Sequence, residues 1–343
     1  MDEYLSKHHE IQAAVIGCVS YWQQNHDHQQ DDKNVGVATK LNGKSSCSDS
    51  HQSFVDVSQG KEPYLRPYLH EQCSVLQVES NDEENSLSTS YTTTIGSLYK
   101  LPPDVSFEIV TLRHFDTITY EGQFKSQTRA ASVQLKTKKH QSQKSSASGF
   151  LVLLLDRSSH WRCISATFAV SYDDDASRRN PTCLVRPTDM KDVMSCVWDG
   201  YCTANRACDG IKMAEVFHET CRLTYVDVSS KSATDHSDDG IRIWDSKRFC
   251  QKVTNRYISE PPHIPYAHLQ NDQLAASGDE LLGIEFTEGS PCVAMITLKV
   301  GHPPFLWTDL LTCAKLGTKW YIVHKSSTSE PFLTHLSSTT SNK

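Results

Sequence analysis

The sequence predicts an α+β protein made of two similar domains, each with about three helices packed on a curled antiparallel sheet. Three observations favour this fold class. Several short motifs occur twice along the 343 residues in the same order, which is typical of a repeat. In the second half, segments with helical periodicity are grouped before most of the strand-like segments, as in α+β proteins and unlike doubly wound folds. Polar tracts poor in large apolar residues separate these segments.

The repeat is carried by motifs at matching places in the two halves. The segment LHEQCSV at residues 69–75 reappears as FHETCRL at residues 217–223. A helix-like segment precedes each motif, and an apolar run with a tryptophan hairpin closes each half. The paired positions are Cys18 with Cys196, His70 with His218, and Trp161 with Trp320. Their separations are 178, 148 and 159 residues, so the first copy carries 30 extra residues after its first helix.

These spacings divide the chain. We expect a first domain at residues 1–175, a linker at 176–187, a second domain at 188–330 and a disordered tail at 331–343. The extra residues of the first copy lie at about 23–62 and are rich in Gln, Asp, Ser, Lys and His, which predicts a disordered surface loop. A second polar tract, at 136–148, predicts a long turn between two strands.

Composition and charge argue against several classes of partner. A net charge of −7 without a basic stripe gives no indication of nucleic acid binding. The longest apolar run, Phe150 to Leu155, is far too short to span a bilayer. The N-terminal residues Met1 to Tyr4 lack the pattern of a signal peptide. We therefore expect a cytoplasmic protein with no membrane and no nucleic acid partner.

The twelve cysteines indicate packing in the core of a reduced protein. Six of them fall within apolar patterns, namely Cys18, Cys73, Cys163, Cys196, Cys221 and Cys313. Cys202 and Cys208 do not form a Cys-x-x-Cys pair, and no pair of such motifs exists. We expect no metal site and no cofactor.

The elements of the second half follow from periodicity. Asp189 to Tyr201 has apolar residues at helical spacing, with Thr188 available as N-cap. Gly210 to His218 and Ser246 to Tyr257 predict two further helices. The predicted strands are Cys221 to Val228, Leu281 to Phe286, Cys292 to Val300, Phe305 to Leu316 and Lys319 to Lys325.

Three segments of the second half carry a resemblance to a known family. They are Ala207 to Tyr225, Trp307 to Leu311 and Gly317 to Lys325. In order and spacing they resemble the lumazine-binding branch of the nuclear transport factor 2-like, or SnoaL-like, superfamily, and the first half resembles it more loosely. The resemblance implies two tandem cone-shaped domains, in which a bent sheet wraps a long helix and leaves a cavity. That superfamily includes ketosteroid isomerases, dehydratases, polyketide cyclases and epoxide hydrolases, and also members with no reaction, so fold alone does not decide function.

Asp309 is the first candidate catalytic residue. Alternation along its strand places it on an otherwise apolar face with Phe305, Trp307, Leu311 and Cys313. A carboxylate among aromatic side chains is a candidate acid or base for a carbonyl substrate. The alternative is a partly solvated carboxylate that caps an amide at a bend in the strand.

His324 is the second candidate catalytic residue. His324 is four residues after Trp320, so strict alternation along the strand places both side chains on the same face. We therefore expect His324 to point into the same cone and to assist Asp309. The alternative is a histidine at the rim, satisfied by hydrogen bonds. At a separation of 159 residues, the first copy has Phe150 in place of Asp309 and Ser165 in place of His324. Any chemistry therefore belongs to the second domain.

Three aromatic residues are candidate ligand-binding residues: Tyr201, Tyr225 and Trp307. A buried phenol can donate a hydrogen bond to a substrate oxygen, and an indole ring offers a large apolar surface. All three are equally suited to filling an aromatic core. They indicate an interior lined by aromatic groups, as in many small-molecule sites.

The His-Glu-x-Cys element is present in both copies, as His70 with Cys73 and as His218 with Cys221. A metal site or a Cys–His nucleophile pair is one interpretation. A structural role is the simpler one, because both copies keep the element. We expect each histidine to cap a helix C-terminus and each cysteine to pack beneath it.

Three functions from different classes remain open. The first is a small-molecule-binding protein, extending to a lyase or isomerase that acts on a small apolar carbonyl compound by acid–base catalysis without a metal. The second is a noncatalytic ligand-binding cone. The third is an interaction scaffold in which the two domains form an intrachain pseudo-dimer, open to further oligomerisation. The ending from Trp320 to Ser327 also resembles that of iota-class carbonic anhydrases, although it has only one histidine.

Overall fold

The structure is a computed structural model. It describes residues 6–19, 69–80, 106–120, 124–138, 145–172, 185–227, 239–259, 279–288, 291–302 and 305–331 of the chain. The expected loop at 23–62, most of the expected linker at 176–187 and the tail beyond residue 331 lie outside these residues. So does the middle of the polar tract at 136–148, whose two ends belong to strands.

The first half forms a five-stranded sheet, which we call sheet A. Its strands are β1 (Leu69–Ser80), β2 (Phe107–Tyr120), β3 (Phe124–Thr137), β4 (Ser145–Leu155) and β5 (Trp161–Tyr172). Their spatial order is β1-β5-β4-β3-β2. The β1–β5 pair is parallel, and the other pairs are antiparallel. A helix over residues 6–19 packs on one face through Ile11, Ala14, Val15 and Cys18.

The second half forms a six-stranded sheet, which we call sheet B. Its strands are β6 (Phe217–Val226), β7 (Ile241–Asp245), β8 (Glu280–Phe286), β9 (Val293–His302), β10 (Phe305–Leu316) and β11 (Lys319–Pro331). Their order is β7-β6-β11-β10-β9-β8. The β6–β11 pair is parallel, and the other pairs are antiparallel.

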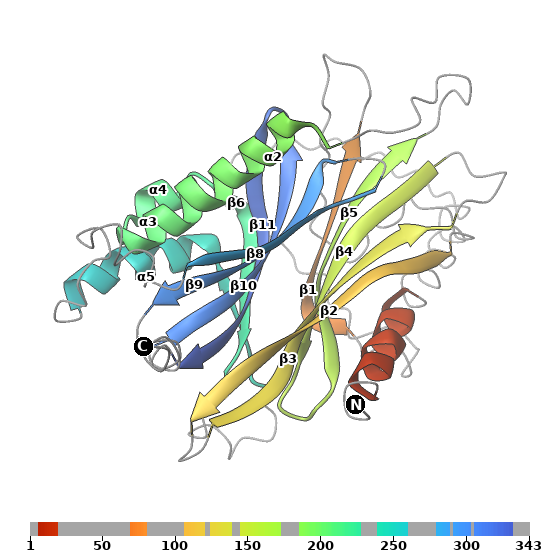
Figure 1. The fold of residues 1–343 in the computed structure, drawn as a ribbon, viewed down its shortest axis with the longest axis horizontal. Coiled ribbons are helices and arrows are strands. Elements are labelled where there is room, and N and C mark those ends of the chain that lie inside the picture. Colours follow the sequence, from red (N-terminus) through yellow and green to blue (C-terminus); the bar gives the residue numbers. More distant parts are fainter. Residues whose placement is uncertain are drawn as a thin grey trace, which may run out of the picture.

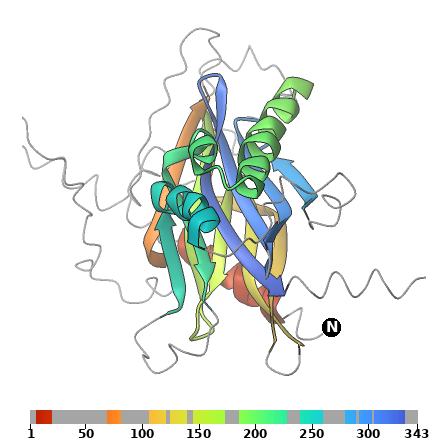
Figure 2. The same ribbon diagram turned by 90° about the vertical axis from the view of Figure 1, so that its left-hand side faces the viewer.

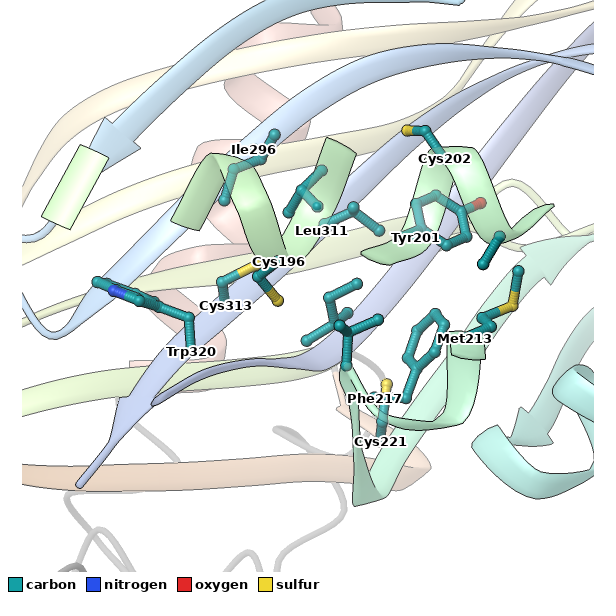
Figure 3. Close-up of a cluster of buried hydrophobic side chains, with 14 of the residues drawn as sticks. Cys196, Tyr201, Cys202, Met213, Phe217, Cys221, Ile296, Leu311, Cys313 and Trp320 are labelled. Carbon is teal, nitrogen blue, oxygen red and sulfur yellow. The ribbon is translucent and has the colours of Figure 1, made fainter. Parts of the chain in front are cut away.

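The helices of the second half cover one face of sheet B. A continuous helical segment consists of α2 (Pro187–Met194), the π-helix η4 (Ser195–Cys202) and α3 (Thr203–Arg206), and it is followed by α4 (Gly210–Ala214) and α5 (Ser246–Ser259). Asp209 caps α4 by accepting a hydrogen bond from the Lys212 amide at 2.9 Å. Figure 3 shows Tyr201 of η4, Leu311 of β10 and other members of the core between these helices and the sheet.

The two sheets pack face to face, with the helices on the outer sides (Figures 1 and 2). The apolar run in β4 shows why: Leu151 and Leu153 belong to the core under the helix at 6–19, whereas Phe150 and Val152 belong to the core between the sheets. Across from them, sheet B contributes Val293, Met295, Leu310, Ala314 and Val323. A strand buried on both faces therefore reads as a continuous apolar run.

The prediction of about three helices on an antiparallel sheet in each domain is wrong. Among the described residues the first half has a single helix, at 6–19, and strands make up most of the structure. Both sheets are mixed, because each contains one parallel pair. That pair joins the first strand of a sheet to its last, and local periodicity does not reveal such a long-range pairing.

The two sheets share their strand order and one irregularity. Without the edge strand β7, the order β6-β11-β10-β9-β8 repeats β1-β5-β4-β3-β2. In sheet A, Leu69 to Ser74 lies opposite Cys163 to Ser165, and in sheet B, Phe217 to Arg222 lies opposite Ile322 to His324. Each first strand thus bulges at the same point, and the residue numbers differ by 148 and 159, the separations seen in the sequence.

The two histidines, expected to cap helix ends, lie in strands rather than in helices. His70 and His218 are both at these bulges. His70 Nε2 contacts Asp239 Oδ2 at 3.1 Å, and His218 Nδ1 contacts Thr220 Oγ1 at 2.7 Å. The partner cysteines, Cys73 and Cys221, are buried as expected. None of the helices in the described ranges combines the length and the apolar character needed to cross a membrane.

Candidate functional site

The candidate site lies on the helix-covered face of sheet B. Asp309 of β10, Ser327 of β11 and Tyr225 of β6 are direct partners across three adjacent strands. Lys325 lies one row further along β11, beside Leu311 of β10. Side chains at paired positions share a face, so the register brings these polar groups together.

Asp309 is fully buried and accepts hydrogen bonds from three side chains. The Tyr201 hydroxyl donates to Asp309 Oδ2 at 2.6 Å, and the Ser327 hydroxyl donates to Oδ1 at 2.7 Å. The Lys325 ammonium donates to the same Oδ1. Leu311 and Cys313 on the same face of β10 are apolar, but η4 and β11 bring polar side chains to the carboxylate. It is the centre of a polar cluster, which we call the Asp309 cluster (Tyr201, Asp309, Lys325 and Ser327).

Lys325 and Ser327 are the two residues of this cluster that the sequence did not indicate, and Lys325 is the charged one. Only 6% of its side chain is exposed, and its ammonium contacts Asp309 and Ser327. It also lies 5.7 Å from the ring centre of Tyr201 and 5.9 Å from that of Phe249, within range of cation–π attraction. Removing one partner of such a buried pair typically costs about 3–5 kcal/mol, because the other charge is left unpaired.

Tyr201 reaches the cluster from the helix side. It lies in η4, and π-helical turns are often found at functional sites. Its ring packs edge-on against Phe217 at 5.7 Å, which fixes its direction. Burial, together with the negative charge of Asp309, raises the pKa of the Tyr201 phenol well above its usual value. Tyr201 therefore remains protonated and acts as a hydrogen-bond donor.

Aromatic rings continue from the cluster toward one end of the sheet. Tyr225 packs edge-on against Trp244 at 5.7 Å and against Trp307 at 6.3 Å, and Trp307 meets Phe305 at 5.8 Å. We call these four residues the aromatic row. Tyr225 and Trp307 are partly buried, and Phe305 is 44% exposed. The row therefore connects the buried cluster with the surface.

A second ion pair lies within electrostatic reach of the cluster. Arg206 Nε contacts Asp279 Oδ2 at 2.8 Å, and Asp279 Oδ1 accepts a hydrogen bond from the Gly301 amide at 2.8 Å. Burial raises the pKa of Asp279, and the charge of Asp309 acts in the same direction. Burial also raises the pKa of the Cys202 thiol, with Asp279 and Asp309 adding to the effect, so Cys202 is a neutral thiol.

His324 does not lie beside Asp309. The pairing of β10 with β11 is irregular between Thr312 and Cys313, so the alternation in β11 shifts by one residue before His324. His324 therefore lies on the other face of the sheet, where its Nε2 contacts Ser326 Oγ at 3.1 Å and Thr224 Oγ1 at 3.4 Å. Burial, assisted by the Lys325 charge, lowers the pKa of His324 to about 3. It is a neutral histidine.

The equivalent positions in sheet A have no polar cluster. By strand pairing, Gly149 opposite Phe168 corresponds to Asp309 opposite Ser327. The constant separation of 159 residues placed Phe150 at the position of Asp309, one residue away from Gly149. The difference arises because the β4–β5 hairpin has one more residue between its paired positions than the β10–β11 hairpin. Ala166 corresponds to Lys325. A Cβ atom at Gly149 would collide with the Thr167 carbonyl oxygen and the Phe168 ring, so an aromatic side chain fills this position in sheet A.

The structure thus brings together four of the five predicted site residues. Asp309 and Tyr201 are hydrogen-bonded, and Tyr225 and Trp307 follow on the same face. His324 is separated from them, and Lys325 and Ser327 take part instead. In the part of the chain that the structure describes, no group of three or more His, Cys, Asp or Glu side chains is arranged to hold a metal ion.

No protein-family model matches the chain, and no curated protein matches it. Several solved structures are similar, and three are described as nuclear transport factor 2-like proteins of unknown function. One from Silicibacter pomeroyi DSS-3 is 11% identical, covering 43% of this chain and 100% of its own, with a TM-score of 0.31. One from Shewanella baltica OS155 is 14% identical, covering 43% and 99%, with a TM-score of 0.31. One from Methylobacillus flagellatus KT is 18% identical, covering 43% and 95%, with a TM-score of 0.31.

Proposed function

We propose that the second half of the chain binds a small, largely apolar molecule between sheet B and its helices. The polar end of the ligand lies against the Asp309 cluster, and its apolar body lies along Tyr225 and Trp307. The cluster presents an ammonium, a carboxylate and two hydroxyls as polar groups, and the aromatic row presents aromatic side chains and a route to the surface. A few polar groups beside aromatic side chains are typical of small-molecule sites.

One observation carries this proposal: sheet A builds the same strand order without the cluster. Gly149, Ala166 and Phe168 occupy the positions of Asp309, Lys325 and Ser327. Replacing a buried ion pair by well-packed apolar groups is often neutral or stabilising by about 1–4 kcal/mol. The polar groups of sheet B are therefore better explained by a ligand than by the needs of the fold.

We also propose that the two halves are tandem copies of one domain of the nuclear transport factor 2-like type, packed as an intrachain pseudo-dimer. The shared strand order, the matching bulges and the core between the two sheets support it. The proposed boundaries remain 1–175 and 188–330.

Acid–base catalysis is a second candidate function, as a lyase or isomerase acting on a small apolar carbonyl compound. The 2.6 Å hydrogen bond between the Tyr201 hydroxyl and Asp309 favours it, because a phenol and a carboxylate in contact can pass a proton to and from a bound carbonyl compound. This function places proton transfer on Tyr201 and Asp309 and gives His324 no part.

The test is native mass spectrometry of the full-length protein purified from its own cells. We expect a bound small molecule, lost or strongly reduced in an Asp309→Asn variant. The matched control is Asp156→Asn, which changes an equally buried, ion-paired aspartate in the β4–β5 turn and should leave occupancy unchanged. A protein that carries a partner chain and no small molecule would contradict ligand binding and favour a scaffold.

A further inference from the structure

Lys325 has the surroundings of a nucleophilic lysine. Its amine contacts a carboxylate that can take its proton, and that carboxylate is in turn held by the Tyr201 and Ser327 hydroxyls. A nucleophile in contact with a base that a third group orients is the arrangement found in covalent catalysis. The amine and the carboxylate are in direct contact, so a proton can pass between them without a bridging water.

We propose that Lys325 forms an imine with the carbonyl carbon of a small aldehyde or ketone bound at this site. This inference rests on the proposed function and names its ligand class. Tyr201 is the proton donor for the carbonyl oxygen, because its hydroxyl lies in the same cluster and remains protonated. The aromatic row accommodates the apolar part of the ligand.

The reaction balances without an oxidant or a co-reactant. Asp309 takes one proton from the Lys325 ammonium, and the free amine attacks the carbonyl carbon, so that a C–N bond forms and an electron pair moves to oxygen. That oxygen takes the Tyr201 proton, which Asp309 restores. Asp309 then takes a second proton from nitrogen and returns it to the departing hydroxyl. The C–O bond breaks, water leaves, and a protonated imine remains, equal in charge to the original ammonium.

Two other lysines of the same half provide matched comparisons. Lys315 contacts Asp189 at 2.7 Å, and Lys299 contacts Glu330 at 2.8 Å. Their side chains are 19% and 21% exposed, against 6% for Lys325. Each is thus an ion-paired lysine on sheet B outside the Asp309 cluster.

The experiment treats the full-length protein at pH 7 with benzaldehyde and cyanoborohydride, which reduces an imine to a stable amine. Peptide mass mapping then compares benzylation at the three lysines. We expect Lys325 to be labelled about tenfold faster than Lys315 or Lys299, because its base and acid are already in place. In a Tyr201→Phe variant, labelling of Lys325 should fall at least about tenfold, while that of Lys315 is unchanged.

Equal or slower labelling of Lys325 in the folded wild-type protein would overturn the proposal. That readout needs no variant to fold. If native mass spectrometry finds a noncovalent ligand while Lys325 is not labelled preferentially, the imine proposal fails and ligand binding stands. If no ligand is found and Lys325 is labelled preferentially, the reactive lysine stands and the expectation of a ligand retained from the cell fails.

Discussion

Lys325 and His324 are adjacent in the chain and lie on opposite faces of β11. The lysine takes part in the Asp309 cluster, whereas the histidine contacts Thr224 and Ser326 on the face toward sheet A. Both are almost completely buried. One face thus holds a paired charge, and the other holds a histidine that stays neutral.

The histidine gives the protein an acid-sensitive contribution to stability. In the unfolded chain His324 takes up a proton near its ordinary pKa of 6.5, but in the folded protein its pKa is lowered to about 3. This contribution is therefore present in full above pH 6.5 and is lost as the pH falls toward 3, by up to about 1.4 kcal/mol for each pH unit. We expect a His324→Gln variant to lose less stability than the wild type over this range.

Urea unfolding at several pH values between 7 and 4 measures this difference. The control is His160→Gln, which changes a histidine whose side chain is 60% exposed and should keep the wild-type slope. Parallel stability curves for the wild type and the His324→Gln variant would contradict the prediction.

At the scale of single elements, the sequence predicted β10 within its observed bounds, Phe305 to Leu316, because its apolar alternation is regular. It also placed Asp309 and Trp307 on one face of this strand, as the structure does. It missed Lys325 because strict alternation was carried through the irregularity in β11. One extra residue reverses the parity of everything that follows, and no residue in the run from Lys319 to Lys325 marks that point.

The sequence also failed to predict the parallel strand pairs and the position of Gly149, for a related reason. The parallel pairs β1–β5 and β6–β11 depend on contacts between distant segments, which local patterns do not encode. The Gly149 position was misaligned because the two hairpins differ in length by one residue between paired positions. Segments with regular alternation were therefore predictable, and places where the register changes were not.

Gly149 provides a test at this scale. A Gly149→Ala variant should lose about 1–3 kcal/mol of unfolding free energy, because the added Cβ collides with backbone and with the Phe168 ring. The measurement is chemical denaturation. The matched control is Gly283→Ala in β8, where the nearest atom to the added Cβ is a terminal nitrogen of Arg113 at 3.1 Å. That flexible side chain can move, so equal losses in the two variants would contradict the assignment of Gly149 as a close-packed position.

At the scale of the whole molecule, the core between the sheets joins the two halves. Hydrogen bonds between the halves also hold them together. Thr111 donates to Glu285 at 3.0 Å, and the Arg157 side chain donates to the Asp227 carbonyl at 2.9 Å. Because Leu310 packs in this shared core, truncating it affects both sheets. The halves are therefore expected to open as one cooperative unit.

Hydrogen exchange followed by mass spectrometry tests this expectation. A Leu310→Ala variant should lose about 2–5 kcal/mol of stability, and exchange should accelerate in peptides of β4 as well as β10. The control is Ile211→Ala on α4, since Ile211 is 80% exposed and should leave exchange unchanged in both. Acceleration confined to sheet B would show that the halves open independently.

The face-to-face packing has a consequence for how many sites the protein can carry. In a symmetric homodimer every substitution appears twice, so a buried ion pair acquired by one subunit is imposed on the other. Here one chain builds both sheets, and a change in sheet B is not copied into sheet A. One sheet can therefore hold a buried ion pair, that of Lys325 with Asp309, while the matching described positions of the other stay apolar. The site proposed for sheet B is thus not repeated at those positions of sheet A.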